Sequence, residues 1–426
     1  MRRAIVLSGG GGKGAYQIGV WKALKRLHKR YHVVTGTSVG ALNGAYMVQK
    51  DFRKAIYTWE NMDYQTVFDE TGEIKTKKDA ISFYVKGVIK NKGLKPTKLE
   101  ELIQNTVDEK KFRKSKIDYG LVTYNLTKME PVSLKKNEIK YGELCDYLLA
   151  SASCFPVFSK KEIENQNFID GGYYDNVPFK LAEDFKVDEI IVVDLEAPGI
   201  KRNPKDVKEH LIWISPRNKL NSFLSFNAEE SKKNICYGYN DTMKTFHRLD
   251  GNRFTFKRKQ LQRYYERKKE IFIQTIKDTV YLENQTKPIL RKFLDIEIFN
   301  ILFQKNDEKK QELFYDIMEY AGLCFELDES KIYSVISYSV KLLKKANKEM
   351  SSVQNDGPKE KIKRLIYSKD RIIKMLELLT EKTSSSKEKL SIMAVLHPKD
   401  FLASCYLYIL NNDSKWIVIL CYYIFH

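Results

Sequence analysis

The sequence predicts an α/β domain with a mostly parallel sheet, followed by an all-α domain. Up to about residue 250, short β-branched segments alternate with helical patterns and glycine-containing turns, as in parallel α/β folds. After Asp250-Gly251, glycine nearly vanishes and long Lys/Glu/Leu/Ile segments carry apolar residues at helical spacing. A length of 426 residues suits two or three domains. We therefore expect one domain at residues 1–250 and a helical domain at 251–426.

The expected elements follow from these patterns. Strands in the first domain are predicted at Arg3–Leu7, Tyr31–Thr35, Tyr119–Tyr124, Glu189–Asp194 and Leu211–Ile214. Helices between them are predicted at Ala15–His28, Val39–Val48, Asp79–Ile89 and Thr97–Val107. The helices predicted for the second domain are Arg258–Ile276, Thr286–Gln304, Lys309–Ala321, Lys331–Glu349 and Glu360–Glu381.

Charge and apolar content bear on whether the protein contacts nucleic acid or a membrane. The 74 Lys and Arg against 55 Asp and Glu give a formal charge of +19, which can attract nucleic acid or an anionic membrane surface. A Lys-rich proteome that uses Lys at solvated positions explains the same number, so charge alone decides nothing. No segment approaches the roughly 20 apolar residues that span a bilayer, and we expect no integral membrane protein.

The N-terminus and the cysteines indicate a cytoplasmic protein. Met1–Leu7 has a basic start but only four apolar residues before glycines begin, which is too short for a secretory signal. The six cysteines are scattered without CxxC spacing, so we expect reduced thiols and neither a disulfide framework nor a zinc site.

A glycine-rich loop, Ser8–Gly14, directly follows the first predicted strand. Its consecutive glycines let the backbone approach a ligand, and its amides with the following helix N-terminus form an anion site. The loop matches G-x-G-x-x-G, but the first acidic residue of the chain is Asp51, too distant to hold a dinucleotide ribose. A P-loop would need Ser or Thr after Lys13. Two interpretations of the loop remain. It is either a cradle for an oxyanion that develops during a reaction or a simple tight turn.

Ser38 is the candidate nucleophile. Gly36-Thr37-Ser38-Val39-Gly40 is a G-x-S-x-G sequence between an apolar strand and an amphipathic helix, which is the context of a nucleophile elbow. Gly36 and Gly40 allow the sharp turn and the close approach of strand and helix. The hydroxyl then stands at the positive end of a helix, which favours a developing negative charge.

Asp170 is the stronger candidate for the base that accepts the serine proton. A Ser…Asp…His triad needs a downstream histidine, and none lies between Ser38 and His210, which itself precedes a predicted strand. Asp170 ends an apolar segment and is followed by two glycines, although Asp and Gly also form plain turns. The segment lacks the ligand spacing of a calcium loop. We expect no metal and no cofactor.

These motifs, in this order, resemble the patatin-like phospholipase family over roughly residues 3–245. The match rests on the glycine loop, the G-x-S-x-G elbow, Asp170-Gly171-Gly172, and two supporting segments, Ala150–Phe158 and Asp175-Asn176-x-Pro178. The resemblance implies a three-layer α/β/α sandwich and a Ser–Asp dyad without histidine. Ser8 departs from the Asp of many members, and we treat it as tolerated.

The resemblance also assigns roles. Ser38 becomes the nucleophile and Asp170 the general base, with the elbow at Gly36 and Gly40. It further places the oxyanion hole at Gly10, Gly11 and Gly12, loop support at Gly9, Lys13 and Gly14, and the dyad loop at Gly171 and Gly172. The implied activity is a lipid acyl hydrolase of the phospholipase A or lysophospholipase type, with phospholipid as substrate and no nucleic acid partner. We expect partial desolvation to raise the pKa of Asp170.

Two segments of the helical half invite alternative interpretations. Arg253–Glu270 has eight basic residues interleaved with four aromatic ones, typical either of docking on anionic headgroups or of a solvated helix face. The tail has two short apolar runs, Phe401–Leu410 and Trp416–Phe425. Each is too short to span a bilayer, and a buried terminal helix is favoured over an interfacial anchor.

Two other functions stay open from the sequence. One is a serine esterase that uses His210 or His247 as its base. The other is a protein without catalytic activity that binds membrane or nucleic acid on the same scaffold. The oligomeric state does not follow from the sequence.

Overall fold

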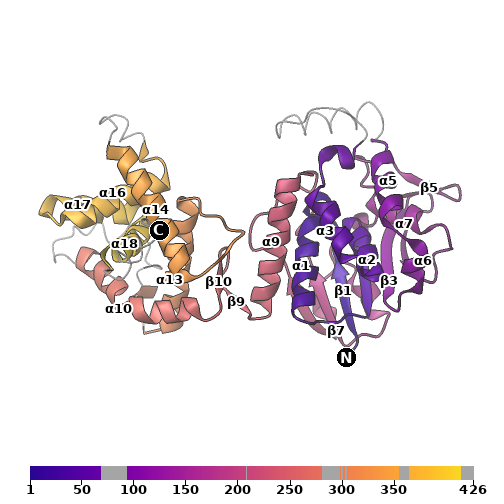
Figure 1. Cartoon of the computed structure of the whole chain (residues 1–426), viewed down its shortest axis with the longest axis horizontal. Helices are drawn as coiled ribbons and strands as arrows, with labels where there is room; N and C mark the ends of the chain where they lie inside the picture. The colour runs from indigo at the N-terminus through magenta and orange to yellow at the C-terminus, as the bar shows by residue number, and fades with distance from the viewer. Residues whose placement is uncertain are drawn as a thin grey trace. The chain divides into compact units, whose positions relative to one another are not determined.

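The computed structural model describes residues 1–68, 94–207, 209–280, 298, 301–302, 305–354 and 364–413. The chain divides into two compact units, Met1–Phe246 and His247–His426, which are described separately (Figure 1). The predicted helix at Asp79–Ile89, most of Thr286–Gln304, and the run Trp416–Phe425 lie outside the described residues.

The first unit is built on an eight-stranded mixed sheet. Its parallel part comprises β3 (Asp118–Asn125), β2 (Val33–Thr37), β1 (Arg3–Leu7), β7 (Glu189–Val193) and β8 (His210–Ile214), in that spatial order. All five strands were predicted, with shifts of at most two residues at their ends. The predicted α/β class with a mostly parallel sheet is confirmed.

Both faces of this sheet are covered, which explains why its strands are continuous apolar runs. Alternate side chains of β1 point to opposite faces. Ile5 and Leu7 join a large core with α1 (Ala15–Arg26), α2 (Val39–Gln49), α3 (Phe52–Glu60), α5 (Thr97–Thr106), α6 (Glu109–Lys114) and α7 (Leu144–Ala152). Ala4 and Val6 join a smaller core beneath α8 (Phe179–Glu183).

Three antiparallel strands were not predicted. They are β4 (Glu130–Lys135), β5 (Lys161–Ile163) and β6 (Gln166–Asp170), at the β3 edge of the sheet. They are short and have partly exposed, polar positions, so they lack the apolar signal of the parallel strands. Strand β6 matters for function because it ends at Asp170.

Helix α9 (Ala228–Thr245) was also missed, because its sequence is too polar to show a strong apolar stripe. It begins at Asn227, whose side chain accepts hydrogen bonds from the amides of Glu229 and Glu230. The helix packs along α1 (Figure 1). The loop before it reaches the glycine-rich loop, which becomes important at the site.

The second unit is mainly helical, as predicted. Its helices include α10 (Gln260–Val280), α13 (Asp307–Cys324), α14 (Val335–Gln354), α16 (Ser368–Glu381), α17 (Ser384–Leu396) and α18 (Pro398–Asn412). It also contains an unpredicted small sheet of β9 (Leu249–Asp250), β10 (Thr255–Lys257) and β11 (Ile332–Tyr333). The predicted buried terminal helix is confirmed for Phe401–Leu410, which lies within α18 and is almost wholly buried.

Candidate active site

Ser38 occupies a sharp turn between β2 and α2. Its backbone has φ 56° and ψ −128°, a conformation that a non-glycine residue rarely adopts. Its amide donates a hydrogen bond of 2.9 Å to the hydroxyl of Ser151 on α7, which in turn donates to the carbonyl of Val122 on β3. Only 8% of Ser38 is exposed. Neighbouring elements therefore hold this serine in an unfavourable backbone geometry.

The two elbow glycines explain why the chain can turn here. A β-carbon on Gly36 would lie 2.3 Å from the carbonyl oxygen of Gly40, and one on Gly40 would lie 2.2 Å from that of Leu7. Any side chain at either position would push the strand, the turn and β1 apart. This close approach was expected from the G-x-S-x-G pattern.

Asp170 lies beside Ser38 because of how the strands pair. Thr37 of β2 pairs with Val122 of β3, and the next residue, Thr123, pairs with Asp170 of β6. The side chain of Ser38 is close enough to the Asp170 carboxyl to lower its pKa. The structure thus brings together the two residues that stand 132 positions apart in sequence.

The environment of Asp170 raises its pKa. The residue is 6% exposed, and this burial lifts the pKa of its carboxyl to about 6, against the opposing effects of the hydrogen bond from Gly172 and of the nearby Ser38 side chain. The Gly172 amide donates to Oδ1 at 2.7 Å, and the Asp170 amide donates to the carbonyl of Ser153 at 2.9 Å. Gly171 lies against the backbone of Val122. The expected raised pKa is confirmed in direction, and it brings the carboxylate closer to the strength of a useful base.

The glycine-rich loop lies directly against Ser38. A β-carbon on Gly9 would be 3.2 Å from the β-carbon of Ser38. The amide of Gly9 donates to the carbonyl of Asn176 at 3.1 Å, and that of Gly12 donates to the carbonyl of Phe223 at 2.7 Å. Among the described residues, no partner is recorded for the amides of Gly10 and Gly11.

This result changes the oxyanion hole that the family resemblance implies. The Gly12 amide is occupied by Phe223, in the loop before α9, and is not free to bind an oxyanion. Of the three predicted donors, the amides of Gly10 and Gly11 have no such partner among the described residues, and their role as oxyanion donors stays a prediction. Gly11 has φ 51°, and a β-carbon there would lie 2.1 Å from the Phe223 carbonyl oxygen, so both backbone conformation and space require glycine.

Lys13 ties the glycine loop to the segment that follows β7. Its ammonium donates to the carbonyls of Leu195 and Glu196, each at 3.2 Å, just after β7. Burial lowers its pKa. Ser8 acts alongside it, because its hydroxyl accepts a hydrogen bond of 2.8 Å from the Leu195 amide. Gly14 closes the 3-10 turn Gly11–Gly14 that follows, just before α1.

Asn176 is a site residue whose role the sequence did not reveal. Its side chain is 2% exposed, and its Nδ2 has no hydrogen-bond partner among the described residues. Its Oδ1 lies 2.3 Å and 3.1 Å from the β-carbon positions of Gly9 and Gly172. Asn176 therefore fills the space between the glycine loop and the Asp170 loop. The sequence signal that could have pointed to Asn176 was the Asp175-Asn176-x-Pro178 segment. For Ser151, the corresponding signal was the segment Ala150–Phe158.

Asp175 ties the same segment to β2. Its carbonyl accepts a hydrogen bond of 2.8 Å from the hydroxyl of Thr37, the residue before the nucleophile. Its carboxylate lies 3.1 Å from Nε of Arg202. Burial raises the pKa of Asp175 to about 6, while Arg202 lowers it. The carboxyls of Asp170 and Asp175 therefore have similar pKa values. An experiment on the pH dependence of the reaction rate needs a control that separates the two.

The histidine alternative does not fit the first unit. His210 starts β8 and pairs with Glu189, the first residue of β7, whereas Ser38 follows the last residue of β2. A five-residue strand spans about 16 Å. His210 therefore lies where the parallel strands begin, and Ser38 lies where they end. His210 is 70% exposed, with Nδ1 3.4 Å from Glu189. His247 is an exposed residue of the second unit. The side chain of Ser38 instead lies near the carboxyl of Asp170.

Cys154 is the other nucleophilic side chain near the dyad. It is partly buried and close enough to Asp170 for that carboxylate to affect its titration. Burial, with a contribution from Asp170, raises the pKa of the thiol to about 12. The thiol therefore remains protonated near neutral pH and does not compete with Ser38 as a nucleophile.

The described residues offer no group of three or more His, Cys, Asp or Glu side chains that could hold a metal ion. Within the same ranges, no helix combines the length and apolar character needed to cross a membrane.

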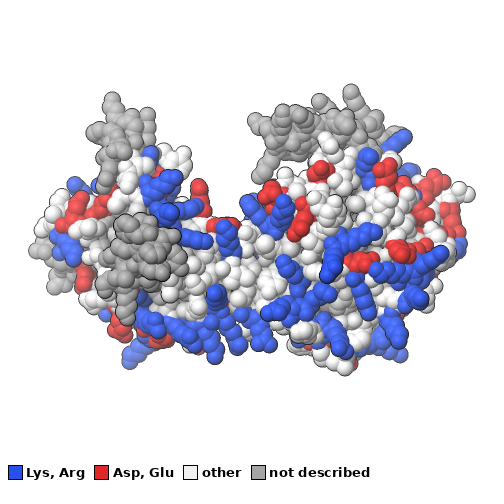
Figure 2. Space-filling view, in the orientation of Figure 1, with Lys and Arg blue, Asp and Glu red and all other residues white. Residues whose placement is uncertain are grey.

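The basic segment 253–270 does not form an aromatic docking face. Its four aromatic residues belong to the core of the second unit, where Phe254 and Phe256 pack against Tyr338, and Tyr264 and Tyr265 pack against Phe314. Several of its basic residues are exposed, namely Lys257, Arg258, Lys259, Arg263 and Arg267. Figure 2 shows Lys and Arg side chains spread over much of the visible face of the protein. Contact of these cations with anionic headgroups stays a prediction, and it would not involve the four buried aromatic rings.

A mixed α/β sheet, a strained serine at the end of a strand, a buried carboxylate near it and a glycine loop against the serine are typical of serine-dependent hydrolases. The comparison with protein families is more specific. Residues 5–183 match the model of the patatin-like phospholipase family. This part of the chain is therefore similar to patatin-like phospholipases, as its motifs predict. The match contains the glycine loop, Ser38 and Asp170, and ends before the second unit.

Two curated proteins are similar to parts of this chain. The cUMP-AMP-activated phospholipase of Escherichia coli is 25% identical over 205 residues, which cover 42% of this chain and 57% of that protein. Patatin-like phospholipase domain-containing protein 7 of Rattus norvegicus is 25% identical over 196 residues, which cover 45% of this chain and 13% of that protein. The chain thus spans only part of the length of these relatives.

Among solved structures, the crystal structure of VipD from Legionella pneumophila aligns with 97% of this chain and 93% of its own. The TM-score is 0.39 and the sequence identity 13%, a similarity too low for functional comparison.

Proposed function

We propose that this protein is a serine lipid acyl hydrolase that cleaves acyl esters through Ser38 and Asp170. The observation that carries the proposal is the juxtaposition of these two buried side chains, which the pairing of β2, β3 and β6 brings together against the glycine loop. The family similarity supports the reaction class, because both residues lie within the patatin-like match. The raised pKa of Asp170 supports its role as the base.

The first half of the reaction acylates Ser38. Its Oγ forms a bond to the ester carbonyl carbon while its proton passes to Asp170, and the carbonyl electron pair moves to the oxygen. The amides of Gly10 and Gly11 hold this oxyanion. When the intermediate collapses, the bond to the alcohol breaks and Asp170 returns the proton to the departing oxygen. Oxyanion donors act where charge develops, and each is worth about 2.7–4 kcal/mol in a comparable site.

The second half releases the acyl group. A water molecule loses a proton to Asp170 and attacks the acyl carbon, and the same two amides hold the new oxyanion. Collapse breaks the bond to Ser38 Oγ, which regains the proton from Asp170. The products are a carboxylic acid and the free enzyme. No metal or cofactor takes part in these proposed reaction steps.

An acyl lipid of the phospholipid or lysophospholipid type is the proposed substrate. Two aromatic residues adjoining the Asp170 region are exposed, Phe155 at 37% and Tyr173 at 45%. The Tyr173 hydroxyl donates to the Phe155 carbonyl, and the pKa of Tyr173 responds to Asp170. Apolar rings at this position provide a surface for an acyl chain. Both curated relatives are named as phospholipases.

The test is hydrolysis by the purified chain of a mixture of phospholipids and lysophospholipids, with the products identified by mass spectrometry. We expect free fatty acid and the matching deacylated lipid. A fluorophosphonate probe should label Ser38, as identified by peptide mapping. If Ser38 is not labelled and no lipid is hydrolysed, the proposal is wrong. The alternative of a protein with a patatin-like fold but no catalytic activity would then hold.

The rate should depend on pH through the base. Asp170 accepts a proton only when ionised, and its pKa is about 6. We expect kcat/KM to fall about tenfold for each pH unit below this value and to level off above it. Asp175 has a similar pKa, so the Asp175→Asn variant serves as the control and should keep the same midpoint. A profile that is flat down to pH 4.5 would contradict the assignment.

The oxyanion loop can be tested at Gly11. The Gly11→Ala change places a β-carbon against the Phe223 carbonyl and disfavours the φ of 51°, so the neighbouring amides should move. We expect kcat to fall about 100- to 1,000-fold, as when one oxyanion donor is lost. Gly142→Ala is the matched control, because Gly142 also has a positive φ, 96°, but open space around it. Equal kcat in the two variants would contradict the role of the loop.

A further inference from the structure

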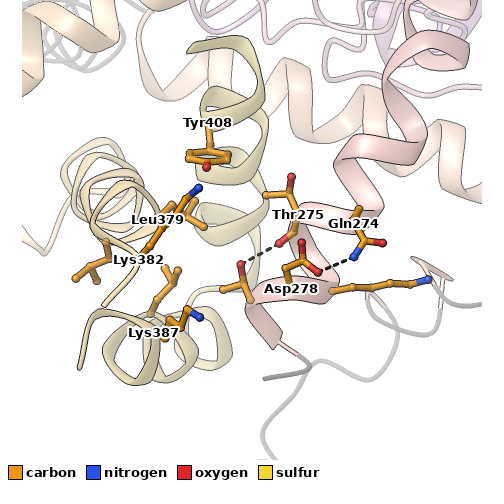
Figure 3. Close-up of a pocket in the computed structure, with 11 residues that line it drawn as sticks. Gln274, Thr275, Asp278, Leu379, Lys382, Lys387 and Tyr408 are labelled. Atoms are coloured by element: carbon orange, nitrogen blue, oxygen red, sulfur yellow. Dashed lines mark hydrogen bonds between the residues drawn. The ribbon is translucent and has the colours of Figure 1, made fainter. Parts of the chain in front are cut away.

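A pocket in the second unit lies apart from the residues assigned to hydrolysis. It is formed by side chains from α10, α16, α17 and α18, together with Lys382 between α16 and α17 (Figure 3). Its volume is about 940 Å³. Small-molecule sites commonly have volumes of about 300–1,000 Å³, so the pocket can accept a ligand of substantial size.

One part of the wall is apolar. Leu378 and Leu379 of α16 and Leu390 of α17 line the pocket, and their exposed fractions are 4%, 8% and 1%. The ring of Tyr408 on α18 adds an aromatic surface. An apolar chain that enters the pocket leaves water and packs against this wall, and the free energy gained comes mainly from the area of the chain itself.

Three lysines line the pocket: Lys277 of α10, and Lys382 and Lys387, which carry the argument that follows. Lys382 follows α16 and its Nζ lies 6.0 Å from the centroid of the Tyr408 ring, while Lys387 belongs to the first part of α17. Figure 3 shows both on the same side of the pocket. No ion pair is recorded for either lysine within the described ranges. Two like charges on one wall favour an anion between them.

The acidic side chain of the pocket does not cancel this charge. Asp278 of α10 accepts a hydrogen bond of 2.6 Å from Gln274, one turn earlier on the same helix. The two residues lie across the pocket from Lys382 and Lys387 (Figure 3). The pocket thus has a cationic side, an apolar wall and a separate polar side.

We propose that this pocket binds an anionic amphiphile, with its carboxylate or phosphate between Lys382 and Lys387 and its apolar chain along Leu378, Leu379 and Leu390. A fatty acid and a lysophospholipid share this chemistry. The inference goes beyond the proposed function, because the site belongs to the other unit and requires no hydrolysis.

The test measures binding of oleate to the full chain carrying Ser38→Ala, so that the catalytic serine is absent. Isothermal titration is done with monomeric oleate, below its aggregation concentration. Adding Lys382→Gln and Lys387→Gln should remove one equivalent of bound oleate or weaken its affinity about tenfold or more, because two charge-assisted contacts are lost. Lys389→Gln is the matched control, since Lys389 is an exposed residue of the same helix outside the pocket and should leave binding unchanged.

Three further ligands separate the sources of affinity. Lysophosphatidylglycerol should compete with oleate, whereas oleyl alcohol lacks the charge and inorganic phosphate lacks the chain, so each should compete at least about tenfold more weakly. Equal competition by oleyl alcohol or by phosphate would overturn the proposal. So would equal oleate binding with and without the two lysines.

A second variant keeps the charges and fills the cavity. Thr275→Phe adds a ring from the α10 side, and it should also remove the oleate equivalent while the melting temperature stays close to that of the parent. Oleate binding that persists unchanged in this variant would overturn the placement of the chain. Hydrolysis is assayed in parallel with the lysine variants that retain Ser38. If the lysine variants lose oleate binding but still hydrolyse lipid, the proposed pocket site is supported. If the wild-type protein is inactive but still binds oleate in this pocket, only the proposed function is wrong.

Discussion

Replacing Ser38 with alanine is expected to lower kcat for acyl ester hydrolysis by about 10⁴- to 10⁶-fold, as in serine hydrolases that lose their nucleophile. The hydroxyl is the only group of the site that can carry the acyl intermediate in the proposed reaction. Fold and stability should change little, because the backbone amide of residue 38, which binds Ser151, is retained. The measurements are fatty acid release from a lysophospholipid and labelling by a fluorophosphonate.

Two control variants make this result specific. Ser384→Ala changes an exposed serine of the second unit and should retain full labelling and activity. His210→Ala removes the histidine of the esterase alternative, at the far end of the sheet, and should also retain activity. An active Ser38→Ala protein, or an inactive His210→Ala protein that folds normally, would contradict the Ser–Asp mechanism.

The Asp170→Asn change is expected to abolish hydrolysis while stabilising the first unit. Asparagine cannot accept the serine proton, but its Oδ1 can keep the hydrogen bond from the Gly172 amide. The buried carboxyl has a pKa of about 6 instead of its ordinary 3.8, so keeping it ionised in the folded state costs free energy. This difference corresponds to about 3 kcal/mol at pH 8, which the variant should recover.

The sign of the pH dependence follows from the raised pKa. Between about pH 4 and pH 6, the folded chain binds a proton at Asp170 that the unfolded chain has lost, so wild-type stability falls as pH rises. The stabilisation in Asp170→Asn should therefore be largest above pH 6 and fall below about 1 kcal/mol near pH 4. Denaturant unfolding followed by tryptophan fluorescence reports on the first unit, which holds Trp21, Trp59 and Trp213. A variant that is destabilised at pH 8 would contradict the cost assigned to this carboxylate.

The local features of the site could be read from the sequence. Gly36 and Gly40 can be predicted because the strand, the turn and the helix that require them are contiguous in the chain. The continuous apolar runs of β1 and β7 likewise indicate strands buried on both faces, and the motifs around Ser38 and Asp170 indicate the family. In each case the information lies within a few residues or in an ordered set of short motifs.

Long-range contacts could not be read in this way. The loss of the Gly12 amide to Phe223 depends on a loop more than 200 residues later in the chain. The fit of Asn176 between two loops depends on packing in three dimensions. The aromatic residues of 253–270 alternate with lysine and arginine in a way that suits a membrane face, but the core of the second unit buries them.

The sequence by itself determined the class of fold and predicted the two residues of the proposed dyad, because backbone conformation and motif order are properties of the chain. Only the tertiary structure decided which loop amides remain available, how far the pKa of Asp170 rises, and that a charged pocket exists in the helical unit. These properties depend on hydrogen-bond competition, desolvation and the convergence of distant side chains, which arise only when the chain is folded.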